Sequence, residues 1–97
     1  YACNDTMALG VAEAVKKAGK DILVCGTDGD KEAISAVDKG EMTATVAQDP
    51  KAIGAKSLDL LVDAVKNGEK PEAGKEFKTY GIEAILINKD NAKDYLK

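Results

Sequence analysis

The sequence predicts an α/β fold built on a parallel sheet, and three observations support this prediction. Short apolar runs alternate along the chain with longer segments in which apolar residues recur every three or four positions, the spacing typical of helices. Glycine, proline or aspartate stands at most boundaries between them, and most connections are short. Such alternation favours parallel strands joined by right-handed crossovers that each contain a helix.

Each expected element has its own start and stop signals. Helices begin behind a capping polar residue and end at glycine, and the third begins at Asp49-Pro50, where proline fits the first helical position. The expected helices span residues 5–18, 31–39, 50–67 and 90–96. The expected strands are a strand end at 1–4 and runs at 22–25, 43–47 and 82–87, with a turn at 26–30 and a polar connection at 69–78.

The composition limits the function classes. A chain of 97 residues is enough for one small domain and its core, and a net charge of -3 argues against a nucleic-acid partner. No apolar run approaches the roughly 18 residues that a membrane span needs, and no signal segment is present. Because the chain begins with Tyr1 rather than Met, we expect a fragment of a larger fold.

Residues for catalysis and metal binding are scarce. The chain has no histidine, which excludes a histidine-based catalytic site within it, and two cysteines are too few for a structural zinc site. We therefore expect no enzyme activity, no metal and no cofactor. Cys3 and Cys25 lie in short apolar runs and are interpreted as buried thiols. A disulfide is the alternative, although side-by-side strands seldom provide its geometry.

Three predicted strands end in the same way, with a polar side chain followed by a helix. These polar residues are Asn4, Asp28 and Gln48. In open parallel sheets, ligands bind beyond the carboxyl ends of the strands, so a ligand would meet these side chains. The amides offer both donors and acceptors, and an ionised carboxylate accepts from two hydroxyls at once. The three together suit a neutral sugar better than a phosphate or a carboxylate.

Helix capping is the alternative role for the same three residues, because polar residues at strand ends often cap the next helix. A second polar residue lies close behind each of them. These are Asp5, Asp30 and Asp49. Either residue of each pair can cap the helix, but the aspartates are available for capping, which would leave Asn4, Asp28 and Gln48 free to bind a ligand.

Two further patterns near Asp28 are weaker. Residues 26–29, Gly-Thr-Asp-Gly, match neither a phosphate loop nor a dinucleotide fingerprint and are interpreted as a strand-to-helix turn. Asp28 and Asp30 lack the spacing of a calcium loop, so a metal is not expected there.

Three motifs follow one another along the chain: Asn-Asp-Thr-Met-Ala-Leu-Gly at 4–10, Gly-Thr-Asp-Gly at 26–29 and Met-Thr-Ala-Thr-Val-Ala-Gln-Asp-Pro at 42–50, with Ile53 and Gly54 following. In this order and spacing, they resemble the ribose-binding branch of the type I periplasmic binding proteins. The resemblance covers essentially the whole chain. It implies a three-layer α/β/α fold, of which this chain would form mainly the C-terminal lobe.

The resemblance also implies how the chain is divided and which residues bind. Residues 1–48 would belong to the C-terminal lobe, 49–78 would pack on the N-terminal lobe, and 79–97 would supply a return strand and tail. Asn4, Asp28 and Gln48 would contact the sugar. The aromatic residues that sandwich the sugar ring would lie elsewhere, since none of the three tyrosines and one phenylalanine stands at a strand end expected to face the cleft. We expect the isolated fragment to self-associate.

Three functions are compatible with such a fold. The first is the extracytoplasmic receptor of a bacterial ABC importer, periplasmic or anchored outside the membrane, which binds a ribose-like monosaccharide and presents it to the membrane permease. The second is the effector domain of a sugar-responsive transcriptional repressor. The third, a small α/β enzyme, is disfavoured because the sequence lacks a nucleophile–base pair, a metal cluster and a phosphate loop.

Overall fold

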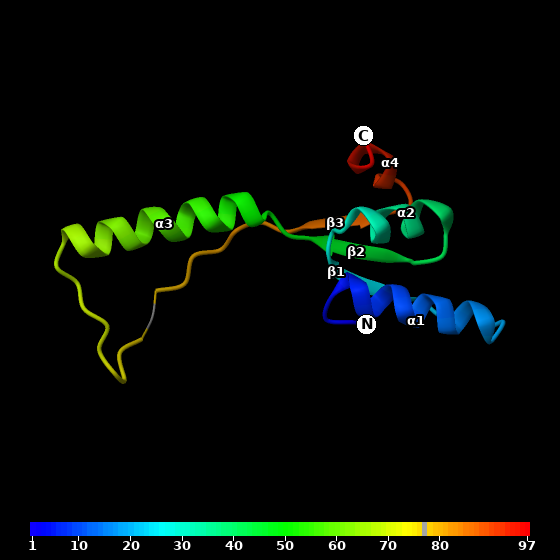
Figure 1. The fold of residues 1–97 in the computed structure, drawn as a ribbon, viewed down its shortest axis with the longest axis horizontal. Helices are drawn as coiled ribbons and strands as arrows, with labels where there is room; N and C mark the ends of the chain where they lie inside the picture. The colour runs from blue at the N-terminus through cyan, green and yellow to red at the C-terminus, as the bar shows by residue number, and fades with distance from the viewer. Residues whose placement is uncertain (77) are drawn as a thin grey trace. The chain divides into compact units, whose positions relative to one another are not determined.

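Helices and strands alternate along the chain, as a computed structural model describes for residues 1–76 and 78–97 (Figure 1). The α/β fold expected from the sequence is confirmed. The elements are α1 (Asp5–Lys17), β1 (Cys25–Asp28), α2 (Lys31–Lys39), β2 (Ala44–Ala47), α3 (Pro50–Lys66), β3 (Ile85–Asn88) and α4 (Ala92–Tyr95).

The chain divides into two units. The first contains residues 1–48 and 84–97 and holds the sheet with α1, α2 and α4, whereas the second contains residues 49–83 and holds α3. Within the described residues, no helix combines the length and apolar character that crossing a membrane requires.

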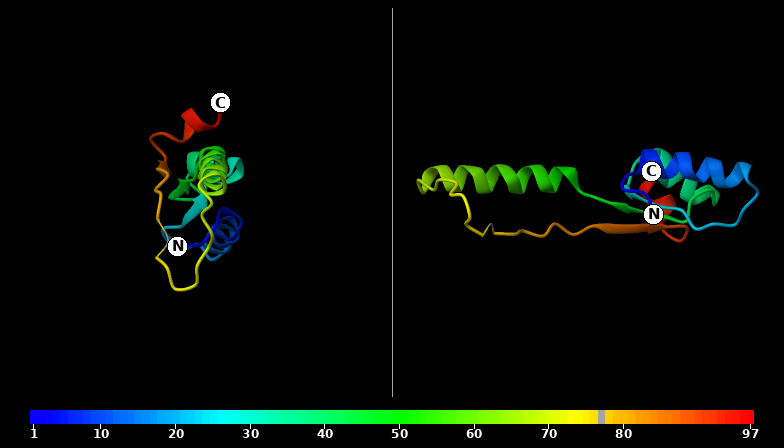
Figure 2. Two further views of the ribbon diagram at one scale, coloured as in Figure 1. Left: turned by 90° about the vertical axis from the view of Figure 1, so that its left-hand side faces the viewer. Right: turned by 90° about the horizontal axis from the view of Figure 1, so that it is seen from below.

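The sheet has the strand order β1-β2-β3, with β2 in the middle (Figures 1 and 2). β1 and β2 are parallel, as expected, but β3 runs antiparallel to β2. Ala47, the last residue of β2, pairs with Ile85, the first residue of β3. The segment that contains α3 therefore leaves and rejoins the sheet at the same end of the strands, so β3 runs antiparallel to β2.

The first strand lies further along the chain than its apolar run suggests. The predicted strand at 22–25 is wrong in position, because Ile22 and Leu23 are 57% and 76% exposed and the ladder with β2 runs from Cys25 to Asp28. Gly26, a poor strand former, is buried and faces Asp5 and Ala8 of α1. Packing against the helix thus overrides local propensity.

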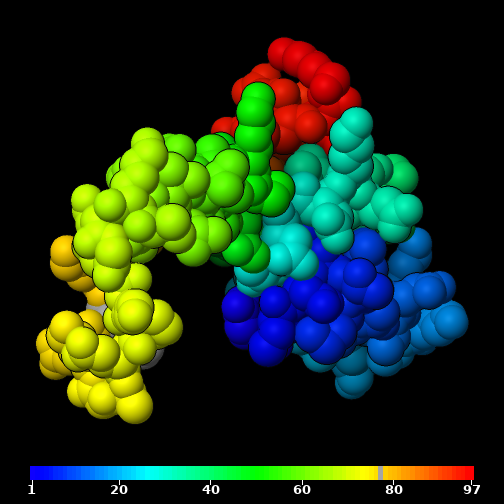
Figure 3. All heavy atoms as spheres, turned by 60° about the vertical axis from the view of Figure 1, so that its left-hand side comes forward, coloured from blue at the N-terminus to red at the C-terminus, as the bar shows by residue number. Residues whose placement is uncertain are grey.

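The core lies between the sheet and the helices α1 and α2, which contact each other. On the surface, atoms of α1 (blue) and α2 (cyan to green) lie side by side (Figure 3). The helix-side face of the sheet carries Gly26, Thr45 and Ile87, which are paired across the three strands and buried. The buried apolar cluster consists of Ala8, Ala12, Val24, Ala33, Ile34, Ala36, Val37, Met42, Ile87 and Ala92.

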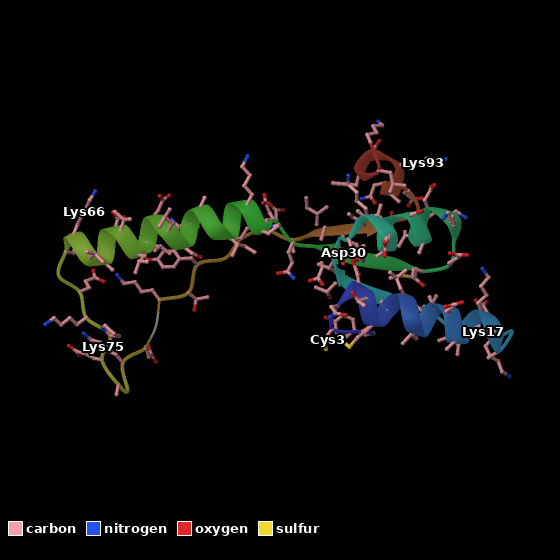
Figure 4. The ribbon with its side chains drawn as sticks, in the orientation of Figure 1. Cys3, Lys17, Asp30, Lys66, Lys75 and Lys93 are labelled. Atoms are coloured by element: carbon pink, nitrogen blue, oxygen red, sulfur yellow. The ribbon has the colours of Figure 1, made fainter. Side chains whose placement is uncertain are left out.

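The two cysteines are both free. Cys25 is half-buried in β1, but Cys3 is exposed, so the expectation of two buried thiols is wrong for Cys3. Cys3 precedes α1, where Figure 4 labels it. The backbone beside it lies next to β1, because the N–H of Ala2 donates to the carbonyl of Cys25 at 2.9 Å.

In the second unit, α3 begins as the sequence predicts. Pro50 occupies the first turn, and the carboxylate of Asp49 accepts a hydrogen bond of 2.9 Å from the N–H of Ala52. No residue of α3 is buried, and several of its large apolar residues are exposed. They are Ile53, Leu58, Leu61, Val62 and Val65.

Candidate functional site

Asp28 and Gln48 lie at strand ends, as the sequence predicts, but residues 1–4 form no strand, so Asn4 does not follow one. Asn4 is the N-cap residue of α1, Asp28 is the last residue of β1, and Gln48 directly follows β2. Because β1 and β2 are parallel neighbours, Asp28 and Gln48 meet at the same edge of the sheet.

Asp28 and Gln48 are joined twice. The side-chain Nε2 of Gln48 donates to Oδ1 of Asp28 at 2.9 Å, and its backbone N–H donates to the carbonyl of Asp28 at 3.2 Å. Asp28 is half-buried and Gln48 is exposed. A carboxylate has about four acceptor positions and a primary amide has two donors, so both groups keep capacity for a ligand.

Asp28 has an unusual backbone conformation. Its φ is +124°, and it is the one non-glycine residue with a positive φ among the described residues. Gly29 follows with φ +80°. A side chain at such a φ costs of the order of 1–3 kcal/mol and persists only where surrounding contacts hold it. The strain therefore requires a specific support.

The turn directly after Asp28 is hydrogen-bonded to Asp5, which the sequence offered only as a possible helix cap. The Asp5 side chain is fully buried. One carboxylate oxygen, Oδ2, accepts hydrogen bonds of 2.8 Å from the N–H groups of both Gly29 and Asp30, and the other, Oδ1, accepts one of 2.7 Å from the hydroxyl of Thr45. Asp5 thus connects α1 to the turn after β1 and to β2.

Of the three aspartates available for capping, only Asp49 caps its helix through its side chain. Asn4, not Asp5, caps α1, because its Oδ1 accepts from the N–H of Met7 at 2.9 Å. Asp30 occupies the N-cap position of α2, where Figure 4 labels it, but its side chain makes no capping hydrogen bond. Capping uses only the oxygen of the Asn4 amide, so its NH₂ group retains donor capacity toward a ligand.

The aromatic residues occupy separate places. The hydroxyl of Tyr1 lies 3.0 Å from the hydroxyl of Thr27 in β1, and the Tyr1 side chain is otherwise exposed. In the second unit, Nζ of Lys56 lies 5.2 Å from the ring centroid of Tyr80. Phe77, the single phenylalanine, lies outside the described residues.

The second unit has a hollow of its own. It has a volume of about 400 Å³ and is lined by Ile53, Lys56, Ser57, Leu60, Tyr80 and Ile82. Its lining is mainly side chains of α3 and of the returning segment. The polar strand-end residues of the first unit are not among its lining residues, so it is not the predicted ligand site.

A protein-family profile described as "Periplasmic binding protein domain" matches residues 1–70. The chain belongs to the periplasmic binding protein family. The resemblance recognised from the three motifs is therefore confirmed at the level of the family.

Individual relatives are similar to most of this chain. The D-allose-binding periplasmic protein of Escherichia coli (strain K12) is 53% identical over 91 residues, which cover 90% of this chain and 29% of that protein. The ribose import binding protein RbsB of the same organism is 46% identical over 74 residues, covering 75% of this chain and 25% of that protein. This chain therefore spans less than a third of the length of either relative.

A solved structure shows the same fold. The ABC transporter periplasmic solute binding protein of Actinobacillus succinogenes 130z, crystallised with bound D-allose, superposes with a TM-score of 0.71 at 32% sequence identity. The match covers 95% of this chain and 31% of that protein. The arrangement of elements described above is thus similar to part of a solved periplasmic solute binding protein.

Proposed function

We propose that this chain is part of the substrate-binding component of a bacterial ABC importer for a ribose-like monosaccharide, and that it binds without catalysis. The observation that carries this proposal is the hydrogen-bonded pair of Asp28 and Gln48 at the carboxyl ends of two parallel strands. The names of the relatives point the same way, since they are binding proteins for allose and ribose.

The chemistry of the strand-end residues fits a sugar. Neighbouring hydroxyls of a monosaccharide donate to a carboxylate and accept from amide NH₂ groups, and Asp28, Gln48 and Asn4 offer both kinds of group. The existing bond between Asp28 and Gln48 holds the two side chains before the ligand arrives, which lowers the ordering cost of binding.

The division of the chain supports a two-lobe receptor. In this proposal, residues 1–48 belong to the C-terminal lobe, 49–78 pack on the N-terminal lobe, and 79–97 provide the return strand and tail. The exposed apolar side chains of α3 are the reason, because a helix of this composition needs a covering partner. Closure of two lobes on the sugar would then present the closed form to the membrane permease. The receptor would act in the periplasm or anchored outside the cell membrane.

The test is a thermal-shift panel on the full-length protein with pentoses and hexoses, D-allose and D-ribose first. A ligand at a hundred times its dissociation constant should raise the free energy of unfolding by about 2.7 kcal/mol. We expect one sugar to raise Tm clearly, Asp28→Ala to remove the shift, and Asp21→Ala, on an exposed residue, to keep it. A folded protein whose Tm no sugar changes would contradict the proposal.

A further inference from the structure

The most deeply buried ionisable side chain, Asp5, has no part in the proposed sugar contacts. It is fully buried, and its two oxygens together accept three hydrogen bonds, from Gly29, Asp30 and Thr45. All three donors lie close in sequence to the proposed ligand residues. Gly29 directly follows Asp28, and Thr45 lies in β2 ahead of Gln48.

The surroundings of Asp5 leave room for this side chain and for little else. A Cβ atom added to Gly26 would collide with Oδ1 of Asp5 and come within 2.9 Å of the Cβ of Ala8. The absence of a side chain at Gly26 is therefore what lets the carboxylate reach both the turn and β2. On the other side of the turn, Gly29 lies so close to Ala47 that an added Cβ would come within 2.8 Å of its Cα.

These contacts fix the backbone on both sides of the strained residue. The Gly29 N–H belongs to the peptide group that directly follows Asp28, so a hydrogen bond to it restricts the ψ of Asp28. The ladder with β2 restricts the side that precedes Asp28. Held between the two, Asp28 keeps φ +124° and presents its Oδ1 to Gln48. A carboxylate suits this position because it has only acceptors, whereas an amide would bring its own donors toward three donors.

We infer that Asp5 is a positioning residue for sugar binding, which holds Asp28 in its strained conformation so that the Asp28 carboxylate and Gln48 face the ligand together. It touches no sugar itself. The role in binding depends on the proposed function, but the role in holding Asp28 does not, so the two can be tested separately.

The test compares Asp5→Asn in the full-length protein with the matched control Asp21→Asn, an exposed aspartate outside the network. The first measurement needs no sugar: the amide proton shifts of Gly29 and Asp30 and the three-bond coupling between the amide and α protons of Asp28. In Asp5→Asn we expect both amide protons to move upfield and the coupling to change as φ relaxes. In the control, all three should stay as in the wild type.

The second measurement is the sugar dissociation constant, taken well below each variant's Tm. Asp5→Asn should weaken binding by about tenfold or more, comparable to the loss of a hydrogen bond to a charged group. In an Asp28→Asn background the same change should cost nothing further, because the carboxylate that Asp5 positions is already gone. A role in stability alone would leave the affinity of the folded protein unchanged.

Three results would overturn the inference: unchanged amide shifts and coupling, wild-type affinity in folded Asp5→Asn, or an equal loss of affinity in both backgrounds. If Asp5→Asn does not fold, Thr45→Val serves instead, because it removes one donor and keeps the carboxylate. It should alter the Gly29 and Asp30 shifts and weaken binding, and wild-type values of both would contradict the role. If the wild type binds no sugar, the proposed function fails while the shifts and coupling still decide whether Asp5 holds Asp28.

Discussion

Nε2 of Gln48 donates a 2.9 Å hydrogen bond to Oδ1 of Asp28, joining the carboxyl ends of two parallel strands. The backbone N–H of Gln48 also donates to the Asp28 carbonyl, at 3.2 Å. The relationship depends on a strained backbone at Asp28, which in turn is supported by the buried carboxylate of Asp5.

Two replacements of Asp28 should both abolish sugar binding but should differ in their effect on stability. Asp28→Gly relieves the positive φ, and Asp28→Ala keeps the strain. We expect the glycine variant to be more stable than the alanine variant by about 1 kcal/mol in urea denaturation, while both lose sugar binding. An alanine variant at least as stable as the glycine variant would show that the backbone at Asp28 is not strained.

Gly29 should tolerate no side chain. Gly29→Ala places a Cβ against the Cβ and Cα of Ala47 and adds the cost of φ +80°, so we expect a loss of roughly 2–4 kcal/mol in the free energy of unfolding. Gly19→Ala is the matched control, because φ is +62° there and no atom lies within 4 Å of the added Cβ. It should cost only about 1 kcal/mol. Equal losses for the two variants would contradict the close approach to Ala47.

Removing the hydroxyl of Thr45 should destabilise the protein even though valine keeps the shape of the side chain. Thr45→Val removes the fully buried donor to Oδ1 of Asp5 and leaves an unpaired carboxylate oxygen, which should cost about 1–3 kcal/mol. Thr27→Val is the control, since its hydroxyl meets that of the exposed Tyr1. Chemical denaturation should show a larger loss in the free energy of unfolding for Thr45→Val than for Thr27→Val. A larger loss for Thr27→Val would contradict the prediction.

The ion pair between Lys16 and Glu41 should give a small, pH-dependent contribution to stability. Their atoms Nζ and Oε1 lie 2.7 Å apart on exposed side chains. The hydrogen bond to Lys16 lowers the pKa of Glu41 below its ordinary 4.5, and the hydrogen bond to Glu41 raises the pKa of Lys16 above its ordinary 10.5.

The contribution is thus fully present between these two ordinary values. It is lost as the pH falls through the folded-state pKa of Glu41, and again as it rises through that of Lys16. Glu41→Gln should reduce the pH dependence of the free energy of unfolding in a series of unfolding experiments at different pH. Near neutral pH it should lower that free energy only slightly, because the pair is exposed. A large loss of stability in Glu41→Gln near neutral pH, or a pH dependence at acid pH equal to that of the wild type, would contradict the pairing.

The isolated chain should self-associate through α3. Leu58, Leu61 and Val65 are 61%, 62% and 71% exposed, and their successive spacings of three and four residues place them along one face of α3. Light scattering at increasing concentration should show association, and Leu61→Lys with Val65→Lys should reduce it. A strictly monomeric isolated chain at high concentration would contradict this prediction.

Helices were the most predictable elements. Asp49-Pro50 marked the start of α3, and Gly40, with φ +80°, marked the end of α2, because these residues satisfy helix ends by local chemistry. The position of β1 could not be predicted from local propensity. The exposed run at Ile22 and Leu23 has stronger strand propensity than Gly26, whose position is set by close packing against Asp5.

The proximity of the strand-end side chains was predictable from the sequence, whereas the contacts that hold the adjacent turn were not. The strand-end rule located Asp28 and Gln48 next to each other, and the structure joins them. The sequence offers both Asn4 and Asp5 as caps of the first helix, and in the structure Asn4 caps it while Asp5 is buried. Nothing local distinguishes the two, because the partners of Asp5 lie 24–40 positions away in sequence.

The most direct measurement is a crystal structure of the full-length protein with the sugar that raises its Tm most. We predict that the Asp28 carboxylate and the amides of Gln48 and Asn4 lie within about 2.7–3.2 Å of sugar hydroxyls, with Asp5 still bonded to the N–H of Gly29. A sugar bound away from Asp28 and Gln48 would contradict the account.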